Sequence, residues 1–263
     1  MSENLKYSVE DRIATIAINR PEARNAITPE MIAEIVRLVR QADADPAVKC
    51  ILLDGEGEHF CAGGDVKGFS EFLAMPADER FDTFERKLLI GNRLPKAILE
   101  ASKPVVVSAK GAVAGAGMGI CLAADFVICG QSSYFLAAHI LIGISLDCGL
   151  SSLLVGAMGI KAAKRLAFLG ESIQAKEALE LGIVTRIVPD HEVTLTATTL
   201  CRRLANGPST ALAGTKSLLN DAAYPTFVEL IAKEATMVAR ATAQDDFRKG
   251  ITAAMAKKPA QFD

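Results

Sequence analysis

Two stretches of small residues in the sequence could form anion-binding sites from backbone amides. The first, residues 59–66, reads His-Phe-Cys-Ala-Gly-Gly-Asp-Val, and the pattern predicts that a helix begins near Asp65. Small residues let a ligand approach the backbone closely. The first amides of a helix lack partners within the helix and carry partial positive charge. Such amides can hold an oxyanion without a charged side chain.

The second stretch, residues 111–119, reads Gly-Ala-Val-Ala-Gly-Ala-Gly-Met-Gly and also follows a predicted strand and opens a helix. It fits the dinucleotide fingerprint G-x-G-x-x-G only loosely. The carboxylate that would bind a ribose about 20 residues later is missing, so a dinucleotide site is not indicated. Taken singly, each stretch could be an anion-binding loop or, equally, only a tight turn between a strand and a helix.

The elements that must position these loops alternate between strands and helices, which favours an α/β core. A hairpin is predicted over residues 5–19 and further strands at 48–53, 105–109, 126–129 and 185–188. Helices are predicted over residues 29–43, 77–101, 149–168 and 175–181. From Asp190 onward the pattern is helical, with breaks at residues 207–208 and 224–225. We therefore expect a core over residues 1–195 and a helical C-terminal region over 196–263, which packs on the core or on a neighbouring subunit.

Composition excludes several classes of protein. The chain has 263 residues, a net charge of −2 and no basic run longer than Lys257-Lys258, so a nucleic-acid partner is not expected. Six cysteines without a CxxC motif and three scattered histidines predict reduced thiols and no metal site. The first twelve residues lack the apolar region of a signal peptide, which predicts a cytoplasmic protein. The apolar segment 135–160 carries Asp147 and small residues near its centre, so we expect buried core elements and no membrane span.

Four segments, in this order, resemble the signatures of the crotonase (enoyl-CoA hydratase/isomerase) superfamily. They are residues 19–26 (Asn-Arg-Pro-Glu-Ala-Arg-Asn-Ala), 60–66, 103–125 and 169–184, and the resemblance covers essentially the whole chain. It implies a spiral of ββα turns with a helical C-terminal extension, assembled as a homotrimer or homohexamer. It also implies an acyl-CoA substrate, with coenzyme A as part of the substrate and no metal or redox cofactor.

The resemblance implies a site for each part of that substrate. The thioester oxygen would accept hydrogen bonds from the backbone amides of Gly64 and Ala116. Many relatives have Gly where this chain has Ala116, but the donor is the backbone, so the oxyanion hole should persist. Coenzyme A would lie along a set of residues in which Arg24 is the natural phosphate partner: Arg24, Ala26, Ala62 and Asp65. Lys257 and Lys258 could reach a phosphate from the C-terminal tail.

The reaction depends on side chains above the thioester. In the family's hydratases two glutamates handle the water, and the matching positions here are Gly119 and His139, which argues against ordinary hydration. Residues 135–147 resemble the branch typified by the phenylacetate-pathway isomerases, in which the aspartate at the position of Asp147 is the acid/base. Burial in an apolar stretch is expected to raise the pKa of Asp147 and suit it to shuttle a proton. Alternatively, Asp147 is an N-cap for a helix over residues 149–157.

Other activities stay open. The dehalogenase branch uses a nucleophilic aspartate at the same position, but its His and Trp positions are Asn92 and His139, and the chain has no Trp. His139 is either a second acid/base or a polar residue fixed by hydrogen bonds. We expect an enoyl-CoA isomerase. The alternatives are a hydratase-like lyase without the glutamate pair and a non-catalytic CoA-binding member. Residues 68–100 are rich in Phe, Leu and Met, so they could line an apolar acyl pocket or form helix core and subunit contacts.

Overall fold

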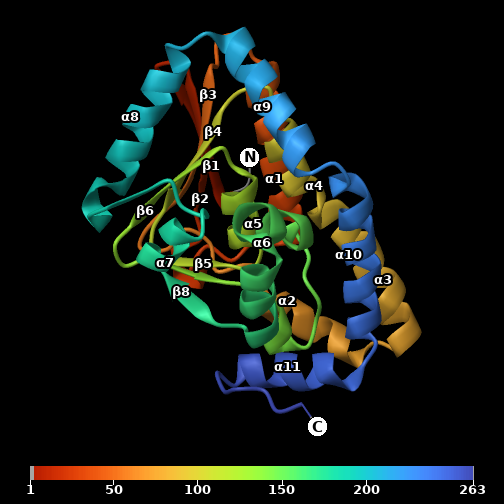
Figure 1. Cartoon of the computed structure of the whole chain (residues 1–263). Helices are drawn as coiled ribbons and strands as arrows, with labels where there is room; N and C mark the ends of the chain where they lie inside the picture. Colours follow the sequence, from red (N-terminus) through yellow and green to blue (C-terminus); the bar gives the residue numbers. More distant parts are fainter. Residues whose placement is uncertain (1–2, 263) are drawn as a thin grey trace.

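The strands of the computed structural model, which describes residues 3–262, form two sheets (Figure 1). The large sheet has the order β1-β2-β3-β4-β6-β9: Leu5–Glu10, Ile13–Ile18, Cys50–Gly55, Val105–Ala109, Phe126–Gly130 and Arg186–Val188. Its first two strands form the predicted hairpin, and the other neighbours are parallel. The small sheet has the order β5-β7-β8: Ala112–Ala114, Tyr134–Leu136 and Ser172–Gln174.

Successive turns of the chain place one strand in each sheet and then a helix. β4 leads into β5 and α5 (Ala116–Ala123), and β6 leads into β7 and then α6 (Leu150–Leu169). The segment after β3 makes an isolated parallel bridge at Cys61 with Val113, beside the small sheet. This repeated order is the predicted spiral of ββα turns. β3 and β4 are apolar throughout most of their length because helices or loops cover both of their faces.

The remaining helices surround this spiral. They are α1 (Pro29–Ala44), α2 (Val66–Ser70), α3 (Ala77–Gly91), α4 (Arg93–Glu100), α7 (Ala175–Glu180), α8 (Val193–Ala205), α9 (Ser209–Ala223), α10 (Phe227–Thr242) and α11 (Asp245–Met255). Short 3₁₀ helices lie at Pro21–Ala23, Glu71–Ala74, Ala138–Ile142 and Asp190–Glu192. As predicted, Thr28 caps α1 by accepting a bond from the Met31 amide at 3.3 Å, with Pro29 at the first helical position.

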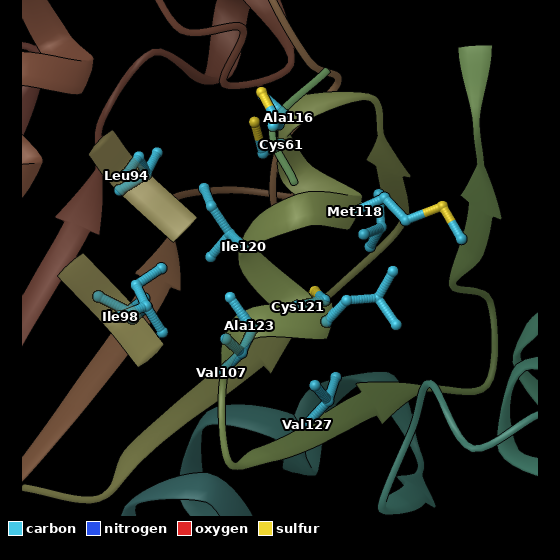
Figure 2. Close-up of a cluster of buried hydrophobic side chains, with 14 of the residues drawn as sticks. Cys61, Leu94, Ile98, Val107, Ala116, Met118, Ile120, Cys121, Ala123 and Val127 are labelled. Atoms are coloured by element: carbon cyan, nitrogen blue, oxygen red, sulfur yellow. The ribbon is translucent and has the colours of Figure 1, made fainter. Parts of the chain in front are cut away.

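The core lies between these layers. Figure 2 shows α5 among apolar side chains of α4, β4 and β6, including Ile98, Val107 and Val127. A second cluster joins α8 to the opposite face of the large sheet. α10 runs beside α3, and α11 crosses below them against α2 and the 3₁₀ helix Ala138–Ile142 (Figure 1). The six cysteines are buried and free.

The prediction of one helix over residues 77–101 is wrong, because the chain breaks at Asn92 into α3 and α4. Pro95 has no N–H to bond the carbonyl of Gly91, so a continuous helix would lose that bond and clash. The three-residue strands of the small sheet were not predicted, since so few residues carry no periodic signal. The tail contains an additional break, between α10 and α11.

The expected boundary between residues 195 and 196 falls inside α8, which packs on the large sheet. Further along the tail, Lys216 of α9 forms a buried ion pair with Asp125 of the core at 2.9 Å. Across the described part of the chain, no helix combines the length and apolarity needed to cross a membrane.

Candidate active site

The two loops of small residues lie side by side at one end of the spiral. The Cys61 amide donates to the Ala112 carbonyl at 3.1 Å, and the Ala114 amide donates back to Cys61 at 2.9 Å. Figure 2 shows Cys61 next to Ala116. The approach depends on Gly117, where an added Cβ would stand 2.4 Å from the Cys61 carbonyl oxygen. Small residues are therefore needed for these loops to meet.

Gly64 and Ala116, one from each loop, line one cavity. The bridge between Ile27 and Gly64 uses the Ile27 amide, which donates to Gly63, and the Asp65 amide, which donates to Ile27, at 2.9 and 3.0 Å. This pairing leaves the Gly64 amide out of the bridge, on the side of the chain that faces away from Ile27. Ala116 is the first residue of α5, so its amide has no carbonyl partner within the helix. Gly64 and Ala116 line the same cavity of about 310 Å³.

Asp147 and His139 form a hydrogen-bonded pair that lines this cavity. The distance from Asp147 Oδ1 to His139 Nε2 is 2.8 Å, and the two side chains are only 14% and 6% exposed. The His139 ring lies near the second loop of small residues, since its Cε1 is 4.0 Å from the position that a Cβ on Gly115 would take. Its Nδ1 is buried without a hydrogen-bond partner among the described residues. One ring nitrogen thus bonds the carboxylate, and the other has no hydrogen-bond partner among the described residues.

The expectation that the pKa of Asp147 is raised is wrong. Burial alone would raise it, but the charge interaction with His139 and hydrogen bonds from His139 and Cys148 lower the pKa of Asp147 below its ordinary value. Nothing in the sequence indicated that this carboxylate has a partner eight residues away. At neutral pH the side chain is therefore a carboxylate, the form that can accept a proton.

Asp147 is not the N-cap of the following helix. Gly149 occupies the N-cap position of α6, and the carboxylate that binds the helix start belongs to Glu234 of α10. Glu234 accepts the Gly149 and Ser151 amides, each at 2.8 Å. Sequence reasoning missed Glu234. The available signal was a charged residue three positions after Ile231, on the face of α10 that is otherwise apolar.

Gly119, the position of one hydratase glutamate, has no room for a side chain. A Cβ there would lie 2.8 Å from the Cys148 carbonyl oxygen and 3.0 Å from the Cys148 Cβ. The loop that carries Asp147 therefore packs directly on α5 at this point.

Aromatic side chains from residues 68–100 line the far part of the cavity. Phe84 is the centre of the cluster, with ring centroids 5.7 Å from Phe69, 5.0 Å from Phe72 and 5.4 Å from Phe247. Phe69, Phe72 and Phe84 all line the cavity. Apolar side chains of residues 68–100 therefore line the same cavity as Gly64 and Ala116.

The residues expected along coenzyme A are brought together only in part. Ala62 and Asp65 line the cavity, and the loop with Arg24 and Ala26 runs beside them, since the Ala62 amide donates to the Arg24 carbonyl at 3.0 Å. The exposed Arg24 is outside the cavity wall. The Asp65 carboxylate caps α2 and pairs with Arg20 at 3.2 Å.

Lys257 and Lys258 are exposed just after α11, and neither lines this cavity. Over residues 3–262, no group of three or more His, Cys, Asp or Glu side chains could hold a metal ion.

Comparison with known proteins agrees with this geometry. A family model described as enoyl-CoA hydratase/isomerase matches residues 8–263. The chain belongs to this family. The enoyl-CoA hydratase/isomerase family, also called the crotonase superfamily, comprises enzymes that use CoA thioesters as substrates without a redox or metal cofactor.

Relatives in this family have different named activities. The chain is 33% identical to 1,2-epoxyphenylacetyl-CoA isomerase of Escherichia coli K12, over 100% of this chain and 99% of the relative. It is 30% identical to trans-2-decenoyl-[acyl-carrier-protein] isomerase of Streptococcus mutans, over 99% and 98%. A crystal structure of an enoyl-CoA hydratase from Mycobacterium avium subsp. paratuberculosis has a TM-score of 0.90 and 29% identity, with both chains covered completely.

Proposed function

We propose that the protein is an enoyl-CoA isomerase that moves a double bond through a thioester enolate. The observation that carries this proposal is that the Asp147 carboxylate, paired with His139, lines the same cavity as Gly64 and Ala116. A base and a pair of amide donors on one cavity are the groups that enolate formation needs.

In this mechanism the thioester oxygen of a 3-enoyl-CoA accepts hydrogen bonds from the amides of Gly64 and Ala116. Asp147 removes a proton from the α carbon. The electron pair of that C–H bond forms a C=C bond, and the carbonyl π pair moves to the oxygen. When that pair returns, the enolate C=C pair shifts to between the α and β carbons, and the former β–γ π pair takes the proton from Asp147 to form the C–H bond at the γ carbon. No water, metal or redox cofactor is consumed.

Replacing Asp147 with Asn tests this proposal, because Asn keeps the size of the side chain but cannot accept the proton. We expect kcat on a 3-enoyl-CoA to fall by about 10²–10⁴-fold, the usual contribution of a general acid–base group. Asp246→Asn, which changes an exposed carboxylate of α11, is the matched control and should keep wild-type turnover. Turnover of Asp147→Asn at the wild-type rate would sink the proposal.

Hydration of a 2-enoyl-CoA is a second candidate. The unpartnered Nδ1 of His139 favours it, because His139 lines the cavity and this buried nitrogen could bind the attacking water after a small rotation of the ring. The packing of Gly119 against Cys148 argues against the usual pair of glutamates. Formation of a 3-hydroxyacyl-CoA from a 2-enoyl-CoA would favour the hydratase. Acyl-CoA binding without turnover in either assay would favour a non-catalytic member.

Assembly into a homotrimer or homohexamer also belongs to this proposal. Support comes from an exposed apolar group at the end of α6 and the preceding 3₁₀ helix, formed by Ile140, Leu141, Phe168 and Leu169. Such a patch is typical of a protein–protein contact. Light scattering coupled to gel filtration would distinguish a trimer or hexamer from a monomer.

A further inference from the structure

We propose that Glu234 and Asn92 are positioning residues that hold the backbone of residues 148–151 and so direct the Asp147 carboxylate toward His139. This inference rests on the proposed role of Asp147. Glu234 does not line the cavity, whereas Asn92 lies on its wall, and we infer that each acts through the loop that carries Asp147.

Glu234 holds the loop with both oxygens of its side chain. It comes from α10, is only 5% exposed and accepts the Gly149 and Ser151 amides at 2.8 Å through different oxygens. A carboxylate that bridges two amides fixes both the place and the orientation of the helix start. The loop between Asp147 and α6 is therefore anchored to a helix of the C-terminal extension.

A carboxylate at this position is costly. The face of α10 around it consists of Phe227, Ile231, Ala235 and Val238, and burial raises the pKa of Glu234. The free amides and the positive end of α6 offset part of this cost. An apolar residue would be more stable in this part of the core. We therefore explain the Glu234 carboxylate by the two amides that it binds, those of Gly149 and Ser151.

Asn92 holds the preceding amide, that of Cys148. Its Oδ1 accepts the Cys148 amide at 3.0 Å, and its Nδ2 donates to the Ile231 carbonyl at 2.6 Å. The side chain is 2% exposed and lies at the break between α3 and α4. Ile231 is one helical turn before Glu234, so both anchors of the loop depend on the same part of α10.

These anchors decide where the Asp147 carboxylate points. Unpartnered amides at the start of a helix attract a nearby carboxylate, and Asp147 is three residues before Leu150, the first residue of α6. Because Glu234 already occupies the helix start, the Asp147 side chain can remain on His139 at 2.8 Å. Without Glu234 we expect Asp147 to turn toward the helix start and leave His139.

The test is steady-state turnover of a 3-enoyl-CoA by full-length Glu234→Ala and Glu234→Gln variants. We expect kcat to fall by about 10²-fold for Ala, the effect of misplacing a catalytic group by about 1 Å, with KM almost unchanged. Gln keeps the volume and one acceptor oxygen, so its loss should be smaller. Asn92→Ala should show the same pattern, a loss in kcat with KM retained.

The matched control is Thr236→Val. It removes the bond from Thr236 Oγ1 to Glu85, at 2.8 Å, from the same helix, but on the side away from the loop. It should retain wild-type kcat. If Thr236→Val, at an equal loss in melting temperature, reduced kcat as much as Glu234→Ala, the role of Glu234 would be only structural and the proposal would be overturned.

A double variant separates this inference from the proposed function. If Glu234 acts through Asp147, then Glu234→Ala should add no further loss to Asp147→Asn. Independent, multiplying losses would overturn the inference. So would wild-type kcat in the folded Glu234→Gln and Asn92→Ala variants while Asp147→Asn is impaired. Full turnover of Asp147→Asn would instead overturn the proposed function itself.

Discussion

Two buried carboxylates near the start of α6 have opposite pKa shifts. Burial raises the pKa of Glu234, whereas for Asp147 the effect of burial is outweighed by His139 and Cys148, so its pKa is lowered. The difference follows from their partners, because Glu234 accepts neutral amides and Asp147 faces an imidazole. At the residue scale, this separation leaves Asp147 ionised and available as a base.

His139 should therefore control the pH dependence of turnover. A base works only when deprotonated, so activity is lost as pH falls through the pKa of Asp147. Replacing His139 with Gln removes the charge interaction with the imidazole that lowers this pKa, while burial still raises it. We expect the acidic limb of the kcat–pH profile to move to higher pH, as measured with a 3-enoyl-CoA.

His191→Gln is the matched control for this measurement, since the His191 side chain is 83% exposed. Its profile should coincide with that of the wild type. An acidic limb that stays in place in His139→Gln would show that His139 does not set the ionisation of Asp147.

At the scale of elements, the site is made where helices begin. α5 begins at Ala116, directly after Gly115, whose φ of 48° and ψ of −116° are accessible mainly to glycine. α2 begins one residue after Asp65, and its preceding loop carries Gly64. The contribution of these loops comes from the backbone, so side-chain substitutions of similar size should have little effect on it.

Ala116→Pro removes one proposed oxyanion donor while keeping the helix, since proline is favoured at the first helical position and has no N–H. We expect kcat to fall by about 10²–10³-fold, the cost of losing one such donor, with the circular dichroism spectrum unchanged. Ala116→Gly keeps the amide and should retain turnover near the wild-type rate. Equal turnover in both variants would contradict a role for this amide.

At the scale of the whole molecule, the C-terminal helices are part of the site and of the core. α10 supplies Ile231 and Glu234 to the loop that carries Asp147, and Phe247 of α11 extends the aromatic cluster of the cavity.

α9 is attached to the core through Lys216. The amine of Lys216 bonds Asp125 and the carbonyls of Ile98 and Lys103 at 2.9, 2.9 and 3.3 Å.

Lys216→Met should destabilise the whole fold, because it leaves the Asp125 carboxylate with no cation and two carbonyls without their donor. The Lys216 side chain is 7% exposed, and removing one partner of a buried pair costs about 3–5 kcal/mol. Urea denaturation should show a free energy of unfolding reduced by this amount. Lys164→Met, at an exposed position of α6, should leave it almost unchanged. A similar small effect at Lys216 would contradict the anchoring role.

The sequence by itself determined the features that depend on local order along the chain. The alternation of strands and helices, the cap of α1 and the two loops of small residues follow from the spacing of apolar, small and capping residues. The order of four motifs then identified the family, and the residues expected at the thioester do line one cavity. Each of these depends on neighbours within a few residues or on pattern alone.

Only the tertiary structure decided which polar groups become partners. Asp147 bonds His139 across a loop, and Glu234 reaches Gly149 from 85 residues away. The contact with His139 lowers the pKa of Asp147, whereas burial outweighs the hydrogen bonds of Glu234 and raises its pKa. Asn92, at the break between α3 and α4, likewise donates a hydrogen bond to the carbonyl of Ile231, which is 139 residues away in the sequence. Burial and hydrogen bonding depend on what packs around a group, so the sequence located the acid and the folded chain determined its ionisation and its orientation.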